Sequence, residues 1–220
     1  MLKKFLNLIY LNFRGYSLLR SYQIIECKNI YLKGKSIEFG AYKNQKKNFC
    51  NFFKGNSDFK FSNIFNNNSS NYIKLDLTQK LKLKKNTFDN VLIFNVLEHL
   101  HDNNIVFNEI RRILKYKGFL IGSTPFIYQV HGAPNDYLRF TKDFYFKKLS
   151  KKFKNIKVLP LGYGPFVSSY SLINPYLKYL PFLKEFILII SFFLDSFLQI
   201  FVKTELKEIY PIGFFFIIKK

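Results

Sequence analysis

The feature that most constrains the fold is a nearly continuous apolar run at residues 88–95, which reads F-D-N-V-L-I-F-N. A strand carries apolar side chains on both faces when both faces of its sheet are covered, as in a parallel sheet. Residues 102–115 follow with apolar side chains at helical spacing and with Asp102 or Asn103 placed to cap the helix. Residues 119–124 then return to a strand pattern. A strand, a crossover helix and a strand in this order predict a right-handed unit of a parallel sheet.

Weaker patterns extend this unit along the chain. We expect Lys117-Gly118 to end the helix of residues 102–115, and a further helix of modest quality before Gly55. Together the segments predict an α/β fold: a doubly wound, mostly parallel seven-stranded Rossmann-like sheet with helices on both faces. The other predicted strands are residues 36–40, 59–65, 72–77, 156–161 and 210–218, a helix is predicted at 141–153, and the Asn-rich tract 66–71 is a predicted surface loop.

A length of 220 residues suits one domain with a sizeable core. We expect peripheral helices in residues 1–34, the core in 35–160, an apolar helical insertion or lid in 161–208, and a terminal strand in 209–220.

Residues 176–202 form an unusually apolar segment that is interrupted by Pro181. The longest uncharged stretch in this segment, residues 186–194, is well short of the ~20 residues that a membrane span needs. A helix that is apolar nearly all round is buried in protein or lies in a bilayer interface. The pattern favours a packed lid or core helix over peripheral membrane contact, and both over a spanning helix.

The formal charge of +21 raises the question of nucleic-acid binding. The cations are mostly lysines, and no basic run interleaves with the aromatic motifs of RNA-binding modules, so no specific nucleic-acid partner is predicted. The excess of Lys, Asn, Ile and Phe is typical of codon bias, and an anion-binding surface is the alternative. Cys27 and Cys50 stand apart without a CxxC or Cys/His grouping, which predicts no disulfide, no zinc site and a cytoplasmic protein.

Polar residues follow five predicted strands at matching places, where ligands of open α/β sheets bind. Gly40 lets a ligand approach the backbone, and the carboxylate of Glu38 suits an ammonium group. Asp76 can accept a hydrogen bond from an exocyclic amino group of the ligand. Leu77 can pack on the face of the ring that carries this amino group, and Asn95 stands near the ammonium group. The alternative for Glu38 and Asp76 is an ordinary carboxylate in a turn. The remaining residues at the strand ends are Ser62, Asn63, Glu98, His99, Thr124, Pro125 and Phe126.

Residues 88–100, F-D-N-V-L-I-F-N-V-L-E-H-L, and residues 109–118, E-I-R-R-I-L-K-Y-K-G, resemble two motifs of one known family. They are similar to the strand and helix-end motifs of class I S-adenosylmethionine-dependent methyltransferases, in the subgroup with the type 11 methyltransferase domain. The resemblance runs from about residue 37 to 153 and returns at 210–220. It implies S-adenosylmethionine as cofactor, held by Glu38, Phe39, Gly40, Asn63, Asp76, Leu77, Asn95 and Val96.

Two departures from the family pattern concern the cofactor site. The first motif of the family carries three glycines after its acidic residue, whereas here only Gly40 follows Glu38. The family places Asp or Glu after the second strand to hold both ribose hydroxyls, whereas here the neutral Asn63 stands there.

A second group of residues is similar to a signature of a subgroup linked to sugar and glycan pathways: Pro125-Phe126, His131, Pro134, Asp136-Tyr137 and Arg139-Phe140-Thr141. The resemblance implies an O-directed enzyme acting on a saccharide or another small polar acceptor, free or lipid-linked. Histidine suits a general base at neutral pH, so His131 is the first candidate and His99 the second. Structural roles are the alternatives for both. Asp136, Tyr137 and Arg139 are candidates to orient the acceptor, unless Arg139 pairs with Asp136 to hold the loop.

One rival function is a catalytically inactive protein of the same fold that acts as a membrane-surface or complex-forming module. The reduced glycine loop, the charge of +21 and the apolar segment 176–202 motivate it. Methylation of nucleic-acid bases is disfavoured because the chain lacks the Asn/Asp-Pro-Pro-aromatic tetrad of amino-directed enzymes.

Overall fold

The computed structural model describes residues 2–65, 69–132 and 135–220, and the chain divides into two compact units. The predicted N-terminal helices and the predicted apolar insertion fall mainly in the first unit. We call the first the helical unit, which comprises Met1–Glu26, Pro125–Val130 and Pro160–Phe214. We call the second the sheet unit, which comprises Cys27–Thr124, His131–Leu159 and Phe215–Lys220.

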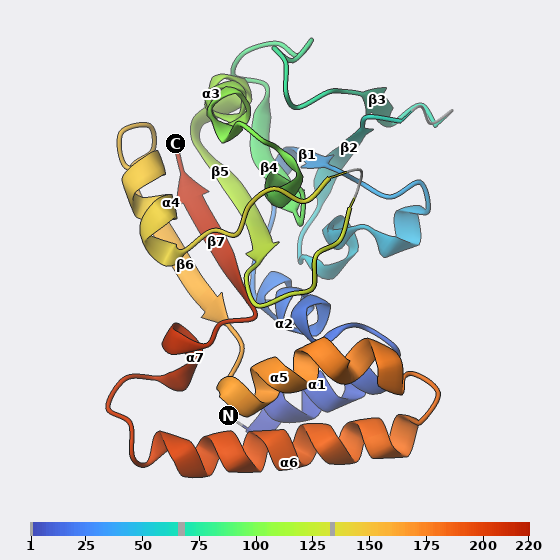
Figure 1. Cartoon of the computed structure of the whole chain (residues 1–220). Helices are drawn as coiled ribbons and strands as arrows, with labels where there is room; N and C mark the ends of the chain where they lie inside the picture. Colours follow the sequence, from blue (N-terminus) through green and yellow to red (C-terminus); the bar gives the residue numbers. More distant parts are fainter. Residues whose placement is uncertain (1, 66–68, 133–134) are drawn as a thin grey trace. The chain divides into compact units, whose positions relative to one another are not determined.

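The described residues form a seven-stranded sheet in the order β3-β2-β1-β4-β5-β7-β6. The four neighbouring pairs from β3 to β5 are parallel, and Figure 1 shows β7 running opposite to β5 and β6. The predicted mostly parallel, Rossmann-like α/β fold is therefore confirmed. The strands are β1 Gly34–Phe39, β2 Ser57–Asn63, β3 Tyr72–Lys74, β4 Phe88–Phe94, β5 Leu114–Pro125, β6 Ile156–Leu161 and β7 Gly213–Lys219.

Strand β4 is the central strand that its apolar run predicted, and every residue in it except Asp89 is buried. Asp89 accepts a hydrogen bond from the backbone N–H of Lys35 at 2.8 Å and pairs with Lys115 at 2.8 Å. Its carboxylate therefore ties together the beginnings of β1, β4 and β5, at the edge of the sheet opposite to the strand ends that carry the predicted site.

Helix α3, Asn103–Ile113, connects β4 to β5 and begins at the predicted cap, where Asp102 accepts from the N–H of Asn104 at 2.8 Å. The expected stop at Lys117-Gly118 was wrong, because the helix ends at Ile113 and β5 already begins at the next residue. Lys117 has a positive φ of 63°, and the register shifts opposite this point. Gly118, which was expected to end the helix, therefore lies at an irregularity within β5. Helix α4, Lys142–Leu149, begins where Thr141 accepts from the N–H of Phe144.

The helix expected before Gly55 is absent, and two short 3₁₀ turns stand in its place, η1 Gln45–Lys47 and η2 Phe49–Phe52. The side chain of Asn44 accepts from the N–H of Lys46, which starts a tight turn in place of a helix. Of the predicted Asn-rich loop, residues 66–68 lie outside the described residues.

The helical unit contains four longer helices and two short ones in its described part. Phe5 of α1 packs edge-on against Phe192 of α6, with ring centroids 4.9 Å apart. The helices are α1 Leu2–Phe13, α2 Leu18–Cys27, whose last residue lies in the sheet unit, α5 Pro165–Ile173, η4 Asn174–Leu177, α6 Pro181–Gln199 and α7 Leu206–Ile209.

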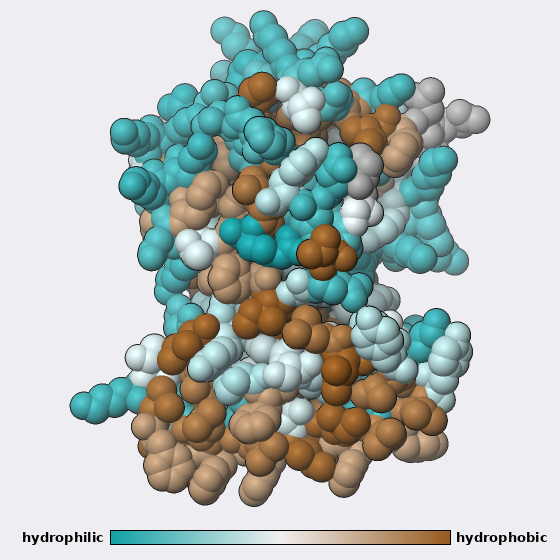
Figure 2. Space-filling view, viewed as in Figure 1, coloured by the Kyte–Doolittle hydropathy of each residue, from teal (hydrophilic) through white to brown (hydrophobic). Residues whose placement is uncertain are grey.

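Helix α6 buries its charged side chains and exposes its aromatic ones except Phe192. Lys184 donates to the carbonyl of Asn12 at 2.5 Å, and Glu185 accepts from the side chain of Asn12 at 3.0 Å. Asp195 is fully buried and accepts from the N–H groups that begin α5. Phe182, by contrast, is 84% exposed. Figure 2 shows the resulting apolar surface in brown at the bottom of the view, where Figure 1 places α6.

Within the part of the chain that the structure describes, no helix combines the length and the apolar character needed to cross a bilayer.

Candidate active site at the strand ends of the sheet unit

Hydrogen bonds join the carboxyl ends of β3, β2 and β1 to one another, and those of β4 and β5 to each other. The N–H of Leu75 after β3 donates to the carbonyl of Asn63 at 3.0 Å, and the Asn63 side chain donates to the carbonyl of Ala41 after β1 at 2.9 Å. The N–H of Asn95 after β4 donates to the carbonyl of Ser123 in β5 at 2.8 Å. The predicted site residues that follow these strands therefore lie along one edge of the sheet.

Gly40 follows β1 and lies against Val96, which follows β4. It has a φ of +69°, and a Cβ at this position would lie 2.3 Å from Cγ2 of Val96. Both the left-handed backbone and the lack of space require glycine here. The one glycine that remains from the family's first motif is thus needed by the fold itself, before any ligand is considered.

Glu38 holds the chain that follows β1. Its two carboxylate oxygens accept from the N–H groups of Phe49 at 2.8 Å and Cys50 at 2.9 Å, and the residue is buried. The structure therefore gives Glu38 a local partner, and its predicted contact with a ligand ammonium stays a prediction.

The other predicted cofactor residues differ in how accessible they are. Asp76 is exposed, and its carboxylate accepts from the N–H of Thr78 at 2.9 Å within a turn of its own. Phe39 and Leu77 are buried, so neither presents an open side-chain face. Asn63 holds Ala41, as described above. Their roles in cofactor binding stay predictions.

Asn95 directs the chain from β4 into the most polar part of the site. Its positive φ of 52° ends the strand and leads through Val96 into the short turn η3, Leu97–His99. Asparagine tolerates this left-handed conformation better than most residues. Glu98 and His99 are therefore placed by a turn that begins at the predicted site residue Asn95.

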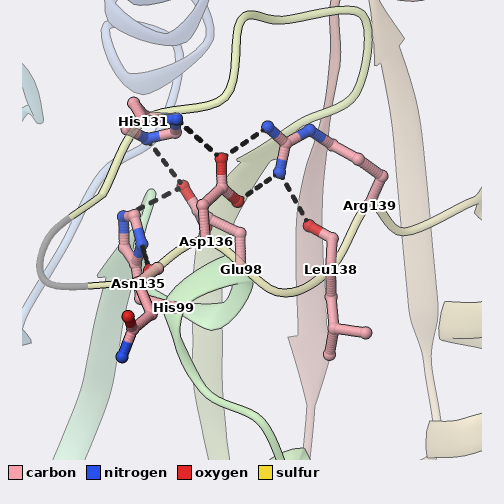
Figure 3. Close-up of polar contacts among 7 residues, drawn as sticks. All are labelled: Glu98, His99, His131, Asn135, Asp136, Leu138 and Arg139. Carbon is pink, nitrogen blue, oxygen red and sulfur yellow. Dashed lines mark hydrogen bonds and ion pairs between the residues drawn. The ribbon is translucent and has the colours of Figure 1, made fainter.

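Glu98, His99 and His131 come together as a compact cluster (Figure 3). The Nε2 atoms of both histidines lie 3.9 Å from Oε1 of Glu98. The two rings meet edge to face with centroids 4.9 Å apart. The Glu98 side chain is fully buried, and among the described residues neither of its carboxylate oxygens has a hydrogen-bond partner.

The opposite nitrogen of each imidazole is held by an oxygen atom. Nδ1 of His99 lies 2.6 Å from the carbonyl oxygen of Asn135, and Nδ1 of His131 lies 3.2 Å from the carboxylate of Asp136. Asp136 also accepts from the N–H of His131 at 3.0 Å and from Nη2 of Arg139 at 2.7 Å. Since an acceptor at Nδ1 favours the proton there, both rings are oriented with Nε2 as the basic nitrogen facing Glu98.

The environment moves the pKa values of these groups apart. Burial raises the pKa of Glu98 to about 8, because the ionised carboxylate loses its solvation. The paired guanidinium of Arg139 holds the pKa of the Asp136 carboxyl far below its ordinary value. Burial also lowers the pKa of His99, despite the bond to Asn135. Carboxyl groups with such different environments within one site are typical of catalytic and binding centres.

The structure brings together four of the predicted catalytic and acceptor residues and adds one. Arg139 pairs with Asp136, as the alternative for these residues predicted. Tyr137 lies at the rim, 48% exposed, and its hydroxyl accepts from the side chain of Asn135 at 2.8 Å. Glu98 was noted at a strand end without a role, and the signal that pointed to it is its place beside His99 in the V-L-E-H motif. Pro134 of the second signature lies outside the described residues.

A family model described as a methyltransferase domain matches residues 43–122. This stretch reaches from the turn after Gly40 through β2, β3, β4 and α3 into β5, and it contains Glu98 and His99. No curated protein matches the chain.

Solved methyltransferase structures share the fold at low sequence identity. Phosphoethanolamine N-methyltransferase 2 of Haemonchus contortus, solved with S-adenosyl-L-methionine, has a TM-score of 0.56 and 14% identity over 90% of this chain. This chain spans 52% of the length of that protein. An S-adenosylmethionine-dependent methyltransferase of Archaeoglobus fulgidus has a TM-score of 0.54 and 15% identity, covering 92% of this chain and 91% of its own. Geranyl diphosphate C-methyltransferase of Streptomyces coelicolor has a TM-score of 0.55 and 10% identity, covering 91% and 80%.

Proposed function

Because this chain carries a class I S-adenosylmethionine-dependent methyltransferase domain, as its motifs predicted, we propose that it methylates a hydroxyl group of a saccharide or another small polar acceptor. The observation that carries the proposal is the cluster of Glu98, His99 and His131, which begins three residues after Asn95 at the end of β4. The cofactor side of the reaction is supported by the match to the methyltransferase domain and by the aligned strand ends around Gly40.

The residues at the strand ends fit a nucleoside methyl donor. Gly40 presents backbone without a side chain, and the exposed carboxylate of Asp76 is bonded only within its own turn among the described residues. In the reaction, the acceptor oxygen forms a bond to the methyl carbon while the carbon–sulfur bond breaks. The electron pair of that bond stays on sulfur, and the acceptor proton passes to a base, for which His131 is our candidate. The protein's part is to align the two partners and to make the acceptor proton easy to remove.

The assignment of the acceptor rests on the loop that contains His131, Asp136 and Arg139. Related folds act on different atoms, since the Haemonchus contortus protein is an N-methyltransferase and the Streptomyces coelicolor protein a C-methyltransferase. The fold therefore does not determine which acceptor atom is methylated, and the residues of the local site must determine it. An imidazole held by a carboxylate suits a hydroxyl, whose proton must be removed, and we assign activation of the acceptor to His131.

Calorimetric titration with S-adenosylmethionine tests the cofactor side. We expect saturable binding by the folded protein, and no heat at cofactor concentrations up to about 1 mM would refute the proposal. Replacing Gly40 by a bulky residue should abolish the binding.

The role of His131 is tested with saccharide acceptors and two histidine variants. His131→Ala should bind the cofactor normally and lose methyl transfer. His101→Ala is the matched control, because His101 lies in the same region but outside the cluster. Unaltered transfer in the His131 variant would exclude a catalytic role for this residue.

The exposed face of α6 supports a second part of the proposal, contact with an anionic membrane surface. The exposed side chains of α6 carry no acidic group, because Glu185 and Asp195 are buried. Lys178 and Lys203 are exposed just beyond the two ends of the helix. An apolar face flanked by cations is the pattern of a helix that lies in a bilayer interface. Such contact would bring the enzyme to a lipid-linked acceptor.

A cavity of about 790 Å³ beside α6 adds to this proposal. Its wall is mainly aromatic and aliphatic, and Lys4, Lys207 and Glu205 stand among the lining residues, with Lys207 paired to Glu205. A cavity of this size and character suits an acyl or isoprenoid chain. The residues that carry this argument are Phe5, Leu8, Phe192 and Phe193.

Co-sedimentation with vesicles of phosphatidylglycerol and phosphatidylcholine tests membrane contact. We expect binding that rises with the fraction of phosphatidylglycerol and that is weakened by the double change Phe182→Ser and Phe193→Ser. Tyr116→Ser is the control, since Tyr116 is exposed on the sheet unit. Equal binding by the wild type and the double variant would refute the role of this face. Vesicle binding by a protein that does not bind S-adenosylmethionine would favour the non-catalytic rival.

A further inference from the structure

We propose that Glu98, His99 and His131 form a binding site for a divalent transition-metal ion of the Zn²⁺ class. One ligand atom from each residue lies within 4.8 Å of the others, in the described part of the sheet unit. The sequence predicted no zinc site because that prediction looked for cysteine motifs, whereas these ligands are two imidazoles and a carboxylate. The use of the ion rests on the proposed function, but the site itself does not.

The geometry of the three ligands is close to that of a metal site with one open position. Two histidines and one carboxylate are a common ligand set of catalytic zinc and of non-haem iron. In a tetrahedral site with bonds of about 2.1 Å, neighbouring ligand atoms are roughly 3.4 Å apart. The two Nε2 atoms lie 3.9 Å from Oε1 of Glu98, so these two distances have to shorten by about 0.5 Å, and all three ligand atoms lie within 4.8 Å of one another.

The contacts at Nδ1 of the two histidine rings are those that metal-binding histidines require. A ligating imidazole almost always donates its other N–H to a carboxylate or a backbone carbonyl, which fixes the ring and makes the ligand atom more basic. His131 has the carboxylate of Asp136 at Nδ1, and His99 has the carbonyl of Asn135 at Nδ1. Arg139 in turn holds Asp136. Both rings are therefore held with Nε2 directed at the same carboxylate, as Figure 3 shows.

Glu98 supplies an independent reason for a cation. Its side chain is fully buried, and neither carboxylate oxygen has a hydrogen-bond partner among the described residues. A buried carboxyl group without partners stays protonated unless a cation pairs with it. The guanidinium of Arg139 is already bound to Asp136 by two nitrogens. A divalent ion between Glu98 and the two histidines would replace the proton of Glu98 and pair with the carboxylate.

The cluster is accessible from the histidine side. The His131 side chain is 30% exposed and that of His99 is 12% exposed, whereas Glu98 forms the buried floor. An ion at this site would take up Nε2 of His131, so His131 would then act on an acceptor hydroxyl through the ion and not as a free base. A bound ion would make the proton of such a hydroxyl easier to remove.

The test is metal binding by the tag-free full-length chain, dialysed against a chelator and titrated with Zn²⁺, with Mg²⁺ as the comparison ion. We expect one Zn²⁺ per chain and no comparable binding of Mg²⁺, because imidazole ligands favour transition metals. Glu98→Gln and His131→Ala should each abolish tight binding, and His101→Ala should not change it. Asp136→Asn should weaken binding by about 10–100-fold without removing a ligand, because Asp136 only positions His131.

Circular dichroism is recorded for each variant, and the Asp136 variant tests the site if a ligand variant does not fold. Absence of stoichiometric Zn²⁺ binding in the wild type overturns the inference. Equal losses in His131→Ala and His101→Ala also overturn it. Titration of the same samples with S-adenosylmethionine keeps the two proposals separate. Zinc binding without cofactor binding would refute the methyltransferase proposal and leave the metal site standing. Cofactor binding without zinc binding would overturn the metal site and leave the methyltransferase proposal standing.

Discussion

Replacing Gly40 by alanine should be far more damaging than replacing a typical glycine, because two separate penalties apply at this position. The first is conformational, since the φ of +69° is left-handed and costs a residue with a Cβ about 1–2 kcal/mol. The second is steric, since the new Cβ would lie 2.3 Å from Cγ2 of Val96, at least 1.1 Å closer than an ordinary contact of 3.4 Å. Overpacking of this kind costs about 1–3 kcal/mol. Gly40→Ala should therefore lower the free energy of unfolding by roughly 2–5 kcal/mol.

Gly15 and Val96 provide the controls that separate the two penalties. Gly15 has a φ of +86° and nothing within 4 Å of its would-be Cβ, so Gly15→Ala should show the conformational penalty alone. In a Val96→Ala background the clashing methyl group is gone, and the nearest remaining atom is Cβ of residue 96 at 3.7 Å. There, Gly40→Ala should cost only about 1–2 kcal/mol.

Urea unfolding of the four Gly40/Val96 combinations and of Gly15→Ala measures these differences, with unchanged m values as the check on two-state behaviour. Equal costs for Gly40→Ala and Gly15→Ala would refute the steric argument. So would a cost of Gly40→Ala that is the same in the wild type and in the Val96→Ala background. Titration of the same variants with S-adenosylmethionine then shows whether the close approach of β1 and β4 is also needed for the cofactor.

Three further predictions concern single contacts. Glu38→Ala should lower the free energy of unfolding by about 1–3 kcal/mol in urea, because the N–H groups of Phe49 and Cys50 lose their acceptor; a neutral result would show that water replaces it. Asp195→Ala should lower the thermal midpoint, because the first N–H groups of α5 lose a buried carboxylate, and an unchanged midpoint would contradict this. Hydrogen bonding to Arg112 lowers the pKa of Glu109 below its ordinary 4.5. In acid, Glu109 therefore binds a proton more readily in the unfolded chain than in the folded one. The free energy of unfolding should then fall as the pH drops below about 4.5. Glu109→Gln should reduce this loss in acid urea titrations, and identical pH profiles would argue against it.

The parts of the fold that were predicted correctly depend on local patterns in the chain. The apolar run of β4 and the helical spacing of α3 each contain their own signal, because burial on both faces or on one face dictates which residues must be apolar. The cap at Asp102 is equally local, since the side chain binds an N–H two residues away. The V-L-E-H motif lies within the stretch that matches the methyltransferase domain model, and it supplies Glu98 and His99 of the candidate site.

The errors have the opposite cause, since each depends on contacts between distant segments. The helix expected before Gly55 does not form, and Glu38 takes up the N–H groups of Phe49 and Cys50. Lys117 bends a strand opposite β4, and this bend could not be told from a helix end without the partner strand.

Only the tertiary structure decided which polar groups pair with one another. It brings His131 to Glu98 across 33 positions in the chain and fixes both histidine rings through Asn135 and Asp136. It also turns the charges of α6 inward, toward Asn12 and the start of α5, and leaves the aromatic face exposed. Apolar periodicity reports that a helix has two faces, but which face is buried depends on the partners that a charged side chain finds.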